Sequence, residues 1–315
     1  MKTTIRIGTR GSRLAIAQTQ IALGALRRAY PSVHYELVTI NTKGDVDKRP
    51  LFTMDEKGIF EKEVNEAVKK RQVDFAVHSL KDIPSDLSVE LTIASIPKRA
   101  SPNDVLVNDK RLKLKELAHG SVVGTSSLRR AVQIMKLRPD LNIKPIRGNV
   151  ETRVKKVINR EYDALVLAEA GLTRIGMKDV IVERFSVREF IPAPGQGAMA
   201  IVCRSDDEAL ADMLRQIDDP NSRAQVMAER ALIRKIEGGC RFPLGAVAIT
   251  NNHKLTLYAS VFSADGKENI KVKRTGNANN PEKLGIKVAE MLVNEGAMKL
   301  AEGWRSAVEE WNKET

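Results

Sequence analysis

The feature that most constrains the fold is an alternation of strand-like and helix-like segments along the first two hundred residues. Hydrophobic runs typical of strands lie at residues 4–8, 35–42 and 73–78. Between them, apolar residues recur at helical spacing in a segment that Ser12 can cap and in another over residues 59–70. Strands that alternate with helices favour parallel or mixed sheets covered by helices on both faces. The sequence therefore predicts an α/β fold of the doubly wound type.

A second group of alternating segments follows and predicts a second sheet. Its strand-like runs, each followed by a helical pattern, lie at residues 122–124, 143–146 and 164–167. Prolines and glycines interrupt residues 191–197, which excludes regular structure and indicates a crossing or hinge segment. Residues 198–203 then form another hydrophobic run that predicts a strand.

The pattern changes near residue 217 and indicates a smaller α+β domain. A long helical segment runs to Ile236, and three strand-like runs and two helical patterns follow it. A chain of 315 residues is also too long for one ordinary core, which makes a cleft between domains available. We predict three domains with the boundaries 1–97 with 198–216, 98–197, and 217–315.

Charge and cysteine content limit the classes of function. The formal net charge of +12 is compatible with a polyanionic partner. Nucleic acid is a weak alternative, because aromatic residues form only 4% of the chain and none of the basic runs is interleaved with them. Two cysteines, Cys203 and Cys240, are too few for a disulfide framework or a multi-cysteine metal site, so we expect no metal.

Hydropathy predicts a cytoplasmic protein. No run approaches the roughly 18 apolar residues of a membrane span. Residues 1–6 lead into a strand-like run without the apolar region of an export signal. We expect a monomer that neither enters a membrane nor binds nucleic acid.

Two strand-to-helix turns resemble each other and indicate anion binding. The first, residues 8–12, contains Arg10 and Ser12, and the second, residues 124–130, contains Thr125, Ser127, Arg129 and Arg130. At such a turn the first helical N–H groups have no intrahelical partners, so amides, hydroxyls and arginines can bind an anionic oxygen. The alternative is that both serines are ordinary helix N-caps.

Further arginines accumulate near the predicted strand ends. Arg147 opens a turn with a glycine and an asparagine, Arg153 lies in the helix that follows, and Arg174 stands near the end of a later helix. Ligands of open α/β sheets bind beyond the carboxyl ends of the strands, and arginine pairs with a carboxylate through two parallel hydrogen bonds. These positions predict a site for a carboxylate-rich small molecule. For any single arginine, a solvated surface position is the alternative.

A charged turn follows the strand-like run that ends at His78. Lys81 and Asp82 lie at the same predicted edge, where a positioned carboxylate can bind a cationic N–H group and transfer a proton. The alternative for Asp82 is an Asx turn before Pro84. His78 itself is more typical of a core histidine than of a catalyst.

Cys240 lies in a glycine-rich loop after the long helix. The glycines allow the loop to approach another body closely, and the nearby Arg234, Lys235 and Arg241 favour a thiolate. A merely structural Cys240 is the alternative. Cys203 lies within an apolar run and is expected to be an inert core residue.

In this order, the motifs closely resemble those of the porphobilinogen deaminase (hydroxymethylbilane synthase) family of tetrapyrrole biosynthesis. The resemblance covers essentially the whole chain. Its most specific segments are residues 77–82, 123–130, 147–149, 194–197 and 237–240.

The resemblance implies two domains of periplasmic-binding-protein type with a cleft between them, and a third domain that carries the cofactor. It implies a transferase that joins four porphobilinogen molecules head to tail, releases ammonia, and frees hydroxymethylbilane by hydrolysis. A dipyrromethane cofactor would be bound covalently to Cys240 through a thioether. Asp82 would be the catalytic residue, which hydrogen-bonds pyrrole N–H groups and stabilises the cation left when ammonia departs.

The resemblance also implies two sets of binding residues. Besides Cys240, those for the cofactor are Lys81, Asp82, Thr125, Ser127, Arg129, Arg130 and Arg147. Those for the substrate porphobilinogen are Arg10, Ser12, Lys57, Arg147, Arg153, Arg174 and Gln196. Each pyrrole ring carries an acetate and a propionate, which explains the number of cations. The main alternative is a non-catalytic two-domain protein that binds anions and needs no Cys240.

Overall fold

The computed structural model describes residues 4–42, 61–237 and 243–304. These residues divide into two compact units. Unit 1 takes in the described residues of 1–48, 56–100 and 197–223, and unit 2 takes in those of 101–196 and 224–315. Each unit contains a five-stranded sheet, and unit 2 contains a three-stranded sheet as well.

Unit 1 is built on a mixed sheet with the strand order β2-β1-β3-β10-β4. The strands are β1 (Thr4–Arg10), β2 (His34–Ile40), β3 (Phe75–Ser79), β4 (Leu91–Ser95) and β10 (Met199–Arg204). β1 runs parallel to β2 and β3, whereas β10 runs antiparallel to β3 and β4. Because parallel strands end at the same edge, the residues that follow β1 and β3 come together there.

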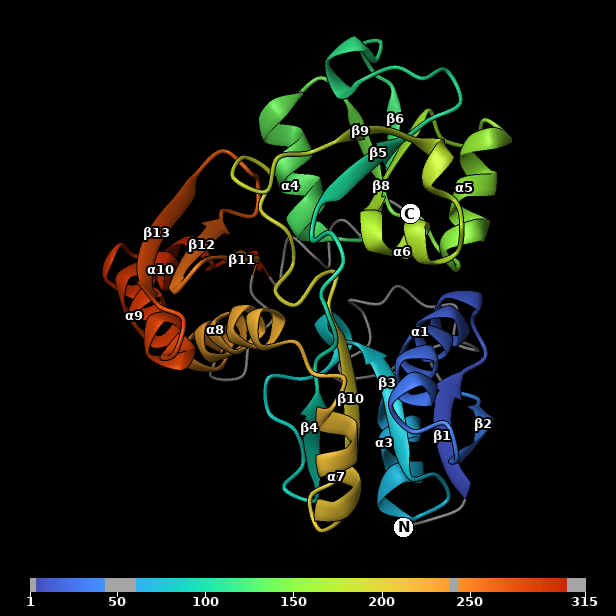
Figure 1. Ribbon diagram of the computed structural model, residues 1–315. Helices are drawn as coiled ribbons and strands as arrows, with labels where there is room; N and C mark the ends of the chain where they lie inside the picture. The colour runs from blue at the N-terminus through green and yellow to red at the C-terminus, as the bar shows by residue number, and fades with distance from the viewer. Residues whose placement is uncertain (1–3, 43–60, 238–242, 305–315) are drawn as a thin grey trace. The chain divides into compact units, whose positions relative to one another are not determined.

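Three helices pack against the unit 1 sheet (Figure 1). They are α1 (Arg13–Ala29), α3 (Lys62–Lys69) and α7 (Glu208–Arg215). α1 buries Ala22, Leu23 and Leu26, which share one face of the helix and pack with Ile7 and Phe75 in the core. The helix predicted from Ser12 toward Tyr30 is therefore confirmed.

Unit 2 repeats this arrangement in a second mixed sheet, ordered β7-β6-β8-β5-β9. The strands are β5 (Asp104–Val107), β6 (Val122–Gly124), β7 (Asn142–Lys144), β8 (Ala164–Ala168) and β9 (Ile181–Arg184), and the helices are α4 (Leu128–Leu137), α5 (Val150–Ile158) and α6 (Glu169–Arg174). β6 runs parallel to β7 and β8, and β5 runs antiparallel to β8 and β9. The predicted second α/β sheet is confirmed.

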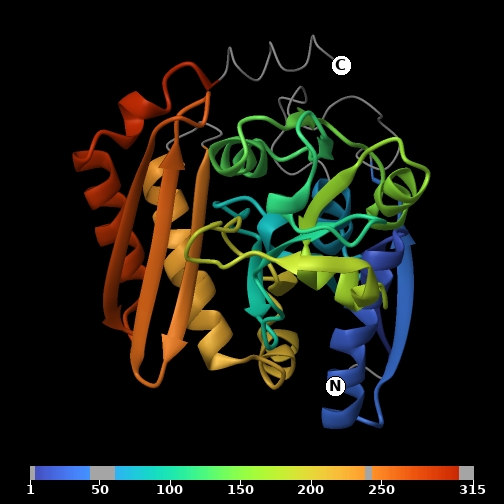
Figure 2. The same ribbon diagram turned by 90° about the horizontal axis from the view of Figure 1, so that it is seen from above.

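The remaining sheet is an antiparallel meander near the end of the chain. Its strands are β11 (Leu244–Asn251), β12 (Lys254–Phe262) and β13 (Asn269–Asn277). Alternate residues of β12, such as Leu255 and Leu257, pack with Leu232 of α8 (Pro220–Glu237) and Val288 of α9 (Pro281–Asn294). Both helices lie along one face of the sheet (Figure 2), and the short α10 (Ala297–Leu300) follows α9. This confirms the smaller α+β element.

The segment predicted to be irregular is irregular in the structure. No regular element covers residues 191–197, and Gly195 has a φ of +73°, a conformation that favours glycine. The sequence reading did not identify β4, β5, β9 and α7, because these short elements lie between strong turn signals without a clear alternation. None of the described helices is long and apolar enough to cross a bilayer.

Candidate functional site

One edge of the unit 1 sheet carries four of the predicted site residues. Arg10 is the last residue of β1, and Ser12 is the N-cap of α1. β3 continues into a 3-10 turn, η1 (Leu80–Asp82), which contains Lys81 and Asp82. Since β1 and β3 are parallel neighbours, the fold brings these residues to one edge.

Asp82 is held by its backbone rather than by its side chain. Its side chain is exposed, and among the described residues no group donates a hydrogen bond to its carboxylate. An Asx turn is excluded, because it needs a backbone N–H two residues after the aspartate, where Pro84 has none. Instead, the Ile83 N–H donates to the Leu80 carbonyl oxygen at 3.1 Å. Both carboxylate oxygens of Asp82 are therefore available to a ligand N–H group.

His78 is a structural histidine, as the sequence predicted. Its side chain is buried in β3, and its Nε2 atom lies 3.1 Å from Oδ1 of Asn65 in α3. Burial, together with the nearby Arg10, lowers the pKa of His78 to about 4. The imidazole is therefore neutral near pH 7, and its contact with Asn65 joins α3 to the strand that leads to Asp82.

The two strand-to-helix turns differ in how they use their serines. Ser12 caps α1, since its Oγ accepts a hydrogen bond from the Ala15 N–H at 3.3 Å. Ser127 makes no side-chain cap for α4; its N–H donates to Oγ1 of Thr125 at 3.2 Å. The hydroxyl of Ser127 is therefore not used to end its helix, whereas that of Ser12 serves the ordinary capping role.

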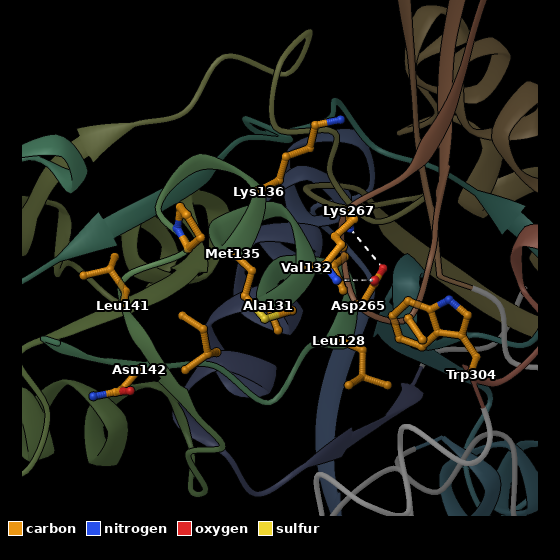
Figure 3. A pocket seen from close by; sticks show the side chains of 14 residues that line it. Leu128, Ala131, Val132, Met135, Lys136, Leu141, Asn142, Asp265, Lys267 and Trp304 are labelled. Carbon is orange, nitrogen blue, oxygen red and sulfur yellow. Dashed lines mark hydrogen bonds and ion pairs between the residues drawn. The ribbon is translucent and has the colours of Figure 1, made fainter. Parts of the chain in front are cut away.

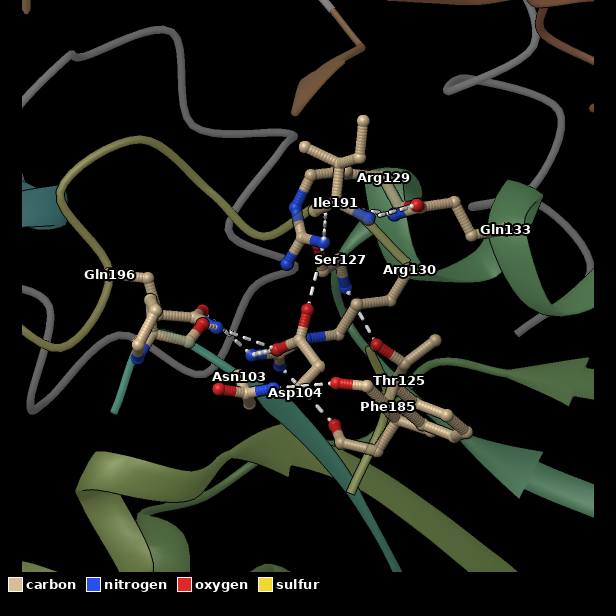
Figure 4. Close-up of polar contacts among 12 residues, drawn as sticks. Asn103, Asp104, Thr125, Ser127, Arg129, Arg130, Gln133, Phe185, Ile191 and Gln196 are labelled. Atoms are coloured by element: carbon tan, nitrogen blue, oxygen red, sulfur yellow. Dashed lines mark hydrogen bonds and ion pairs between the residues drawn. The ribbon is translucent and has the colours of Figure 1, made fainter. Parts of the chain in front are cut away.

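Arg129 and Arg130 converge on a single buried carboxylate in unit 2 (Figure 4). Asp104, at the start of β5, is 0% exposed. Its Oδ2 lies 2.8 Å from Nη1 of Arg129, and its Oδ1 lies 2.7 Å from Nη2 of Arg130. Nε2 of Gln196 also donates to Oδ1 at 2.9 Å. Two cations thus share one anion, so this buried cluster keeps one positive charge.

The cluster extends to the backbone of the crossing segment. Arg129 Nη1 donates to the Ile191 carbonyl oxygen at 2.7 Å, and the Ile191 N–H donates to Oε1 of Gln133 at 2.7 Å. Burial alone would raise the pKa of Asp104, but Arg129 and Arg130 outweigh it and hold that pKa at about 2. The carboxylate is therefore ionised at every physiological pH and fixes both guanidinium groups.

The other predicted arginines gather at the carboxyl-end edge of the second sheet. Arg147 follows β7, and Arg153 lies in α5, where its Nε donates to the Gly148 carbonyl oxygen at 2.7 Å. Asn149 caps α5 by accepting a hydrogen bond from the Thr152 N–H at 3.0 Å. Since β6, β7 and β8 are parallel, their following turns meet at this edge. The edge is strongly cationic.

Arg174 occupies a different environment from a solvated surface arginine. It is the last residue of α6, and burial lowers its pKa to about 10. A guanidinium remains charged at neutral pH even so. A partly desolvated cation of this kind interacts strongly with an incoming carboxylate, because the local dielectric constant is low.

Lys57 and Cys240 lie outside the described residues. Gln196, predicted to bind substrate, is fully buried and bonded to Asp104 and to the Pro102 carbonyl oxygen. Cys203 is buried in β10, and burial raises its pKa to about 11, which confirms an inert thiol.

Two acidic residues were missed in the sequence. Asp104 stands alone before the apolar run of β5, and its pairing with two distant arginines has no local signal. Glu61 lies next to α3 and is 5% exposed, although its sequence context reads as an ordinary solvated helix start. Both acids are distinguished by their burial in the folded chain, which no local sequence pattern indicates.

A separate pocket of about 630 Å³ lies in unit 2 (Figure 3). Its wall is formed by apolar side chains of α4, including Val132 and Met135, and by Trp304. Of the charged groups that line it, Asp265 pairs with Lys267 at 3.5 Å, and Lys136 donates to Oδ1 of Asn269.

Comparisons with known proteins agree on one family. A family model described as "Porphobilinogen deaminase, dipyromethane cofactor binding domain" matches residues 5–212, and one described as "Porphobilinogen deaminase, C-terminal domain" matches residues 223–294. A probable porphobilinogen deaminase of Nitrosopumilus maritimus is 52% identical over 98% of this chain and 98% of its own. The porphobilinogen deaminase of Bacillus subtilis is 40% identical over 99% of this chain and all of its own.

A solved structure gives a more distant likeness. A methionine-binding protein, MetQ, has 15% sequence identity and a TM-score of 0.45, and the match covers 68% of this chain and 89% of that chain.

Proposed function

The chain belongs to the porphobilinogen deaminase family, and we propose that Asp82 and the cationic sheet edges described above carry out its reaction. The activity is that of a transferase, hydroxymethylbilane synthase, in tetrapyrrole biosynthesis. Its substrate is porphobilinogen, of which four molecules are joined head to tail with release of ammonia. The non-catalytic anion-binding alternative is not favoured. The observation that carries the assignment of Asp82 is its exposed carboxylate, which lies on a hydrogen-bonded turn at the end of β3 and accepts no hydrogen bond from a described residue.

The chemistry explains why a fixed carboxylate is needed. When ammonia leaves porphobilinogen, a cation remains that is delocalised onto the pyrrole nitrogen. A carboxylate beside that nitrogen accepts the N–H hydrogen bond and stabilises the charge as it develops, which is where preorganised electrostatics lower a barrier most. Attack by the next ring then releases a proton, and the same carboxylate can accept it.

The arginines are suited to bind the carboxylate groups of the substrate. Each pyrrole carries an acetate and a propionate, so a growing chain brings many carboxylates to the enzyme. We propose that Arg147, Arg153 and Arg174 bind these groups, together with Arg10 and Ser12 of unit 1. A charge-assisted hydrogen bond of this type contributes about 1.5–3 kcal/mol.

The residues that are described fit a dipyrromethane cofactor. The edge of the second sheet carries Thr125, the hydroxyl of Ser127, which does not cap its helix, and the turn at Arg147. Behind them, Arg129 and Arg130 supply a net positive charge. When bound, the cofactor supplies the pyrrole carbon to which the first substrate is joined. We propose that Cys240 holds it covalently and that Lys81 and Lys57 meet further carboxylates.

Three broader features are also proposals. The division into three domains is supported by separate hydrophobic clusters for the three sheets, centred on residues such as Phe75, Phe190 and Leu257. We propose a cytoplasmic monomer that does not bind nucleic acid. Light scattering on the purified chain, and duplex binding measured at low and high salt, test these points directly.

Single-turnover kinetics on cofactor-loaded Asp82→Asn protein test the assignment. Asparagine keeps the shape of the side chain and removes its charge, so we expect elongation to slow by about 10² or more. Asp86→Asn, an exposed position four residues further on, is the matched control and should elongate at the wild-type rate. Wild-type elongation by Asp82→Asn would show that the catalytic acid lies elsewhere.

Intact-mass spectrometry and an aldehyde reagent for pyrroles separate catalysis from simple anion binding. The purified enzyme should carry a covalent mass increase and give the pyrrole colour. A chain that binds porphobilinogen but carries no covalent pyrrole would support the anion-binding alternative instead.

A further inference from the structure

Glu61 is a buried carboxyl group that the roles given above leave unused. It occupies the N-cap position of α3, but its side chain makes no capping hydrogen bond. The residue is 5% exposed, and within the described part of the chain its Oε2 atom has no hydrogen-bond partner. Burying a polar atom without a partner is unfavourable, so helix capping does not explain why an acid stands here.

The position of Glu61 links it to Asp82. α3 packs against β1, β3 and β10. Asn65, whose N–H donates to the Glu61 carbonyl oxygen at 2.8 Å, contacts His78 in the strand that leads into η1. The contact between Asn65, in the first turn of α3, and His78, near the end of β3, places the start of α3 at the end of β3 that continues into Asp82.

Other charges around Glu61 can be assigned by element. Lys62 and Glu63 lie beside it on its own segment, and they act on it in opposite directions. Arg10, at the end of β1, lowers the pKa of His78, which is neutral. From β10, Arg204 donates to the Val68 carbonyl oxygen at the far end of α3. Among the described residues, Asp82 is therefore the acid from a neighbouring element that acts on Glu61.

The protonation state of Glu61 changes near neutrality. Burial is the main cause that raises its pKa to about 7; the carboxylates of Asp82 and Glu63 contribute to this rise, and its own backbone hydrogen bond opposes it. A carboxyl group with this pKa can be neutral or anionic under working conditions.

We propose that Glu61 is a second carboxyl group of the Asp82 site, a positioning residue that sets how much negative charge a bound pyrrole meets there. The proposal rests on the role of Asp82 given above. With Glu61 neutral, Asp82 is the one anion of this pair that faces the ligand. With Glu61 ionised, two like charges act at one edge, which weakens the binding of a substrate that itself carries two carboxylates.

The coupling can be measured without any turnover. In protein labelled with ¹³C at the glutamate carboxyl carbons, the resonance that disappears in Glu61→Gln identifies Glu61. We expect it to titrate near pH 7 in the wild type and at a lower pH in Asp82→Asn, because that variant lacks the neighbouring charge. A wild-type midpoint near the ordinary 4.5, or an unchanged midpoint in Asp82→Asn, would overturn the proposal.

Stability gives a second readout. The pKa of Glu61 is raised in the folded state, so the folded protein binds more protons than the unfolded chain between the ordinary value of 4.5 and about 7. Its favourable contribution is therefore fully present below pH 4.5 and lost as pH rises toward 7. As pH rises from 5 to 8, we expect the urea midpoint of Glu61→Gln to increase relative to that of the wild type.

Glu66→Gln is the matched control for both experiments, because Glu66 lies in the same helix, more exposed and paired with Lys69. Its urea midpoint should not gain on the wild type over this pH range. If the urea midpoint of Glu61→Gln changes with pH in parallel with that of the wild type, as that of Glu66→Gln should, Glu61 does not carry the titration and the proposal is wrong.

Steady-state kinetics connect the charge to the substrate. Between pH 6 and pH 8.5, the ratio of the wild-type KM for porphobilinogen to that of Glu61→Gln should rise roughly threefold to tenfold, the scale of up to one pKa unit of coupling. A constant ratio, despite a titration near pH 7, would refute the positioning role. Failure of Asp82 as the catalytic residue would appear separately, as normal elongation by Asp82→Asn.

Discussion

Replacing Asp104 by asparagine tests whether one buried carboxylate holds the two arginines of unit 2. Asparagine keeps the size of the side chain but leaves Arg129 and Arg130 as neighbouring buried cations without an anion. Removing one partner of a buried ion pair typically costs about 3–5 kcal/mol. The pKa of Asp104 gives an independent value, since a fall from 3.8 to about 2 corresponds to roughly 2–3 kcal/mol. We therefore expect a loss of about 2–5 kcal/mol.

Urea unfolding followed by circular dichroism measures this loss. With a slope of about 3 kcal/mol per molar urea, the upper end of the usual range because the slope rises with chain length, the midpoint should fall by roughly 0.7–1.7 M. Asp212→Asn is the control, because Asp212 also pairs with an arginine, Arg215, but both side chains are exposed, and exposed pairs contribute little. Equal midpoints for Asp104→Asn and the wild type would refute the idea that this carboxylate fixes the arginines.

The pH dependence of the same variant has a defined sign. The pKa of Asp104 is lowered in the folded state, so its contribution is fully present above about pH 4 and is lost as pH falls toward 2. The difference in stability between wild type and Asp104→Asn should therefore narrow through this acid range. A difference that stays constant down to pH 2 would assign the stabilisation to packing rather than to charge.

Other substitutions give further expectations. Cys240→Ser should fold but carry no covalent pyrrole by intact mass, whereas Cys203→Ser should stay loaded and active if it folds. Arg147→Ala should raise the KM for porphobilinogen or reduce cofactor loading by about tenfold or more, from the loss of a charge-assisted hydrogen bond, with partial rescue by lysine; wild-type values would remove it from the site. Gly285→Ala should lower the urea midpoint, at a cost of about 1–3 kcal/mol, because its Cβ would collide with a backbone carbonyl of α8. Gly24→Ala in α1, whose Cβ would meet only Nη1 of Arg28 at 3.8 Å, an ordinary van der Waals contact, should instead be neutral or stabilising.

The sequence predicts those parts of the fold whose signals are local. α1 begins after its cap at Ser12, and β6 covers Val122–Gly124, because a capping serine and a short apolar run bounded by glycine are readable without tertiary information. β5 and β9 are not readable in this way. β5 runs antiparallel to both of its neighbours, β8 and β9, and these pairings join segments that lie far apart in the sequence.

The site shows the same division. Arg147 and Asp82 follow strands in sequence, and the parallel topology alone places them at sheet edges. The pairing of Arg129 and Arg130 with Asp104 cannot be predicted from their spacing, because burial brings together residues from α4 and β5. For the same reason, the unusual environment of Glu61 is a property of the packed unit and not of its local sequence.

The place of β10 in the unit 1 sheet has a consequence for synthesis. β4 pairs within the sheet only with β10, and β10 also covers the open side of β3. More than a hundred residues separate Ser95, the end of β4, from Met199, the start of β10. At about 5–20 residues per second, a ribosome needs roughly 5–20 s to make them. During that time the nascent unit that carries Asp82 exposes strand edges, and the strands of the second sheet, which end at Arg184, are complete before β10 is made. The sheet of unit 1 is therefore the last of the two α/β sheets to close.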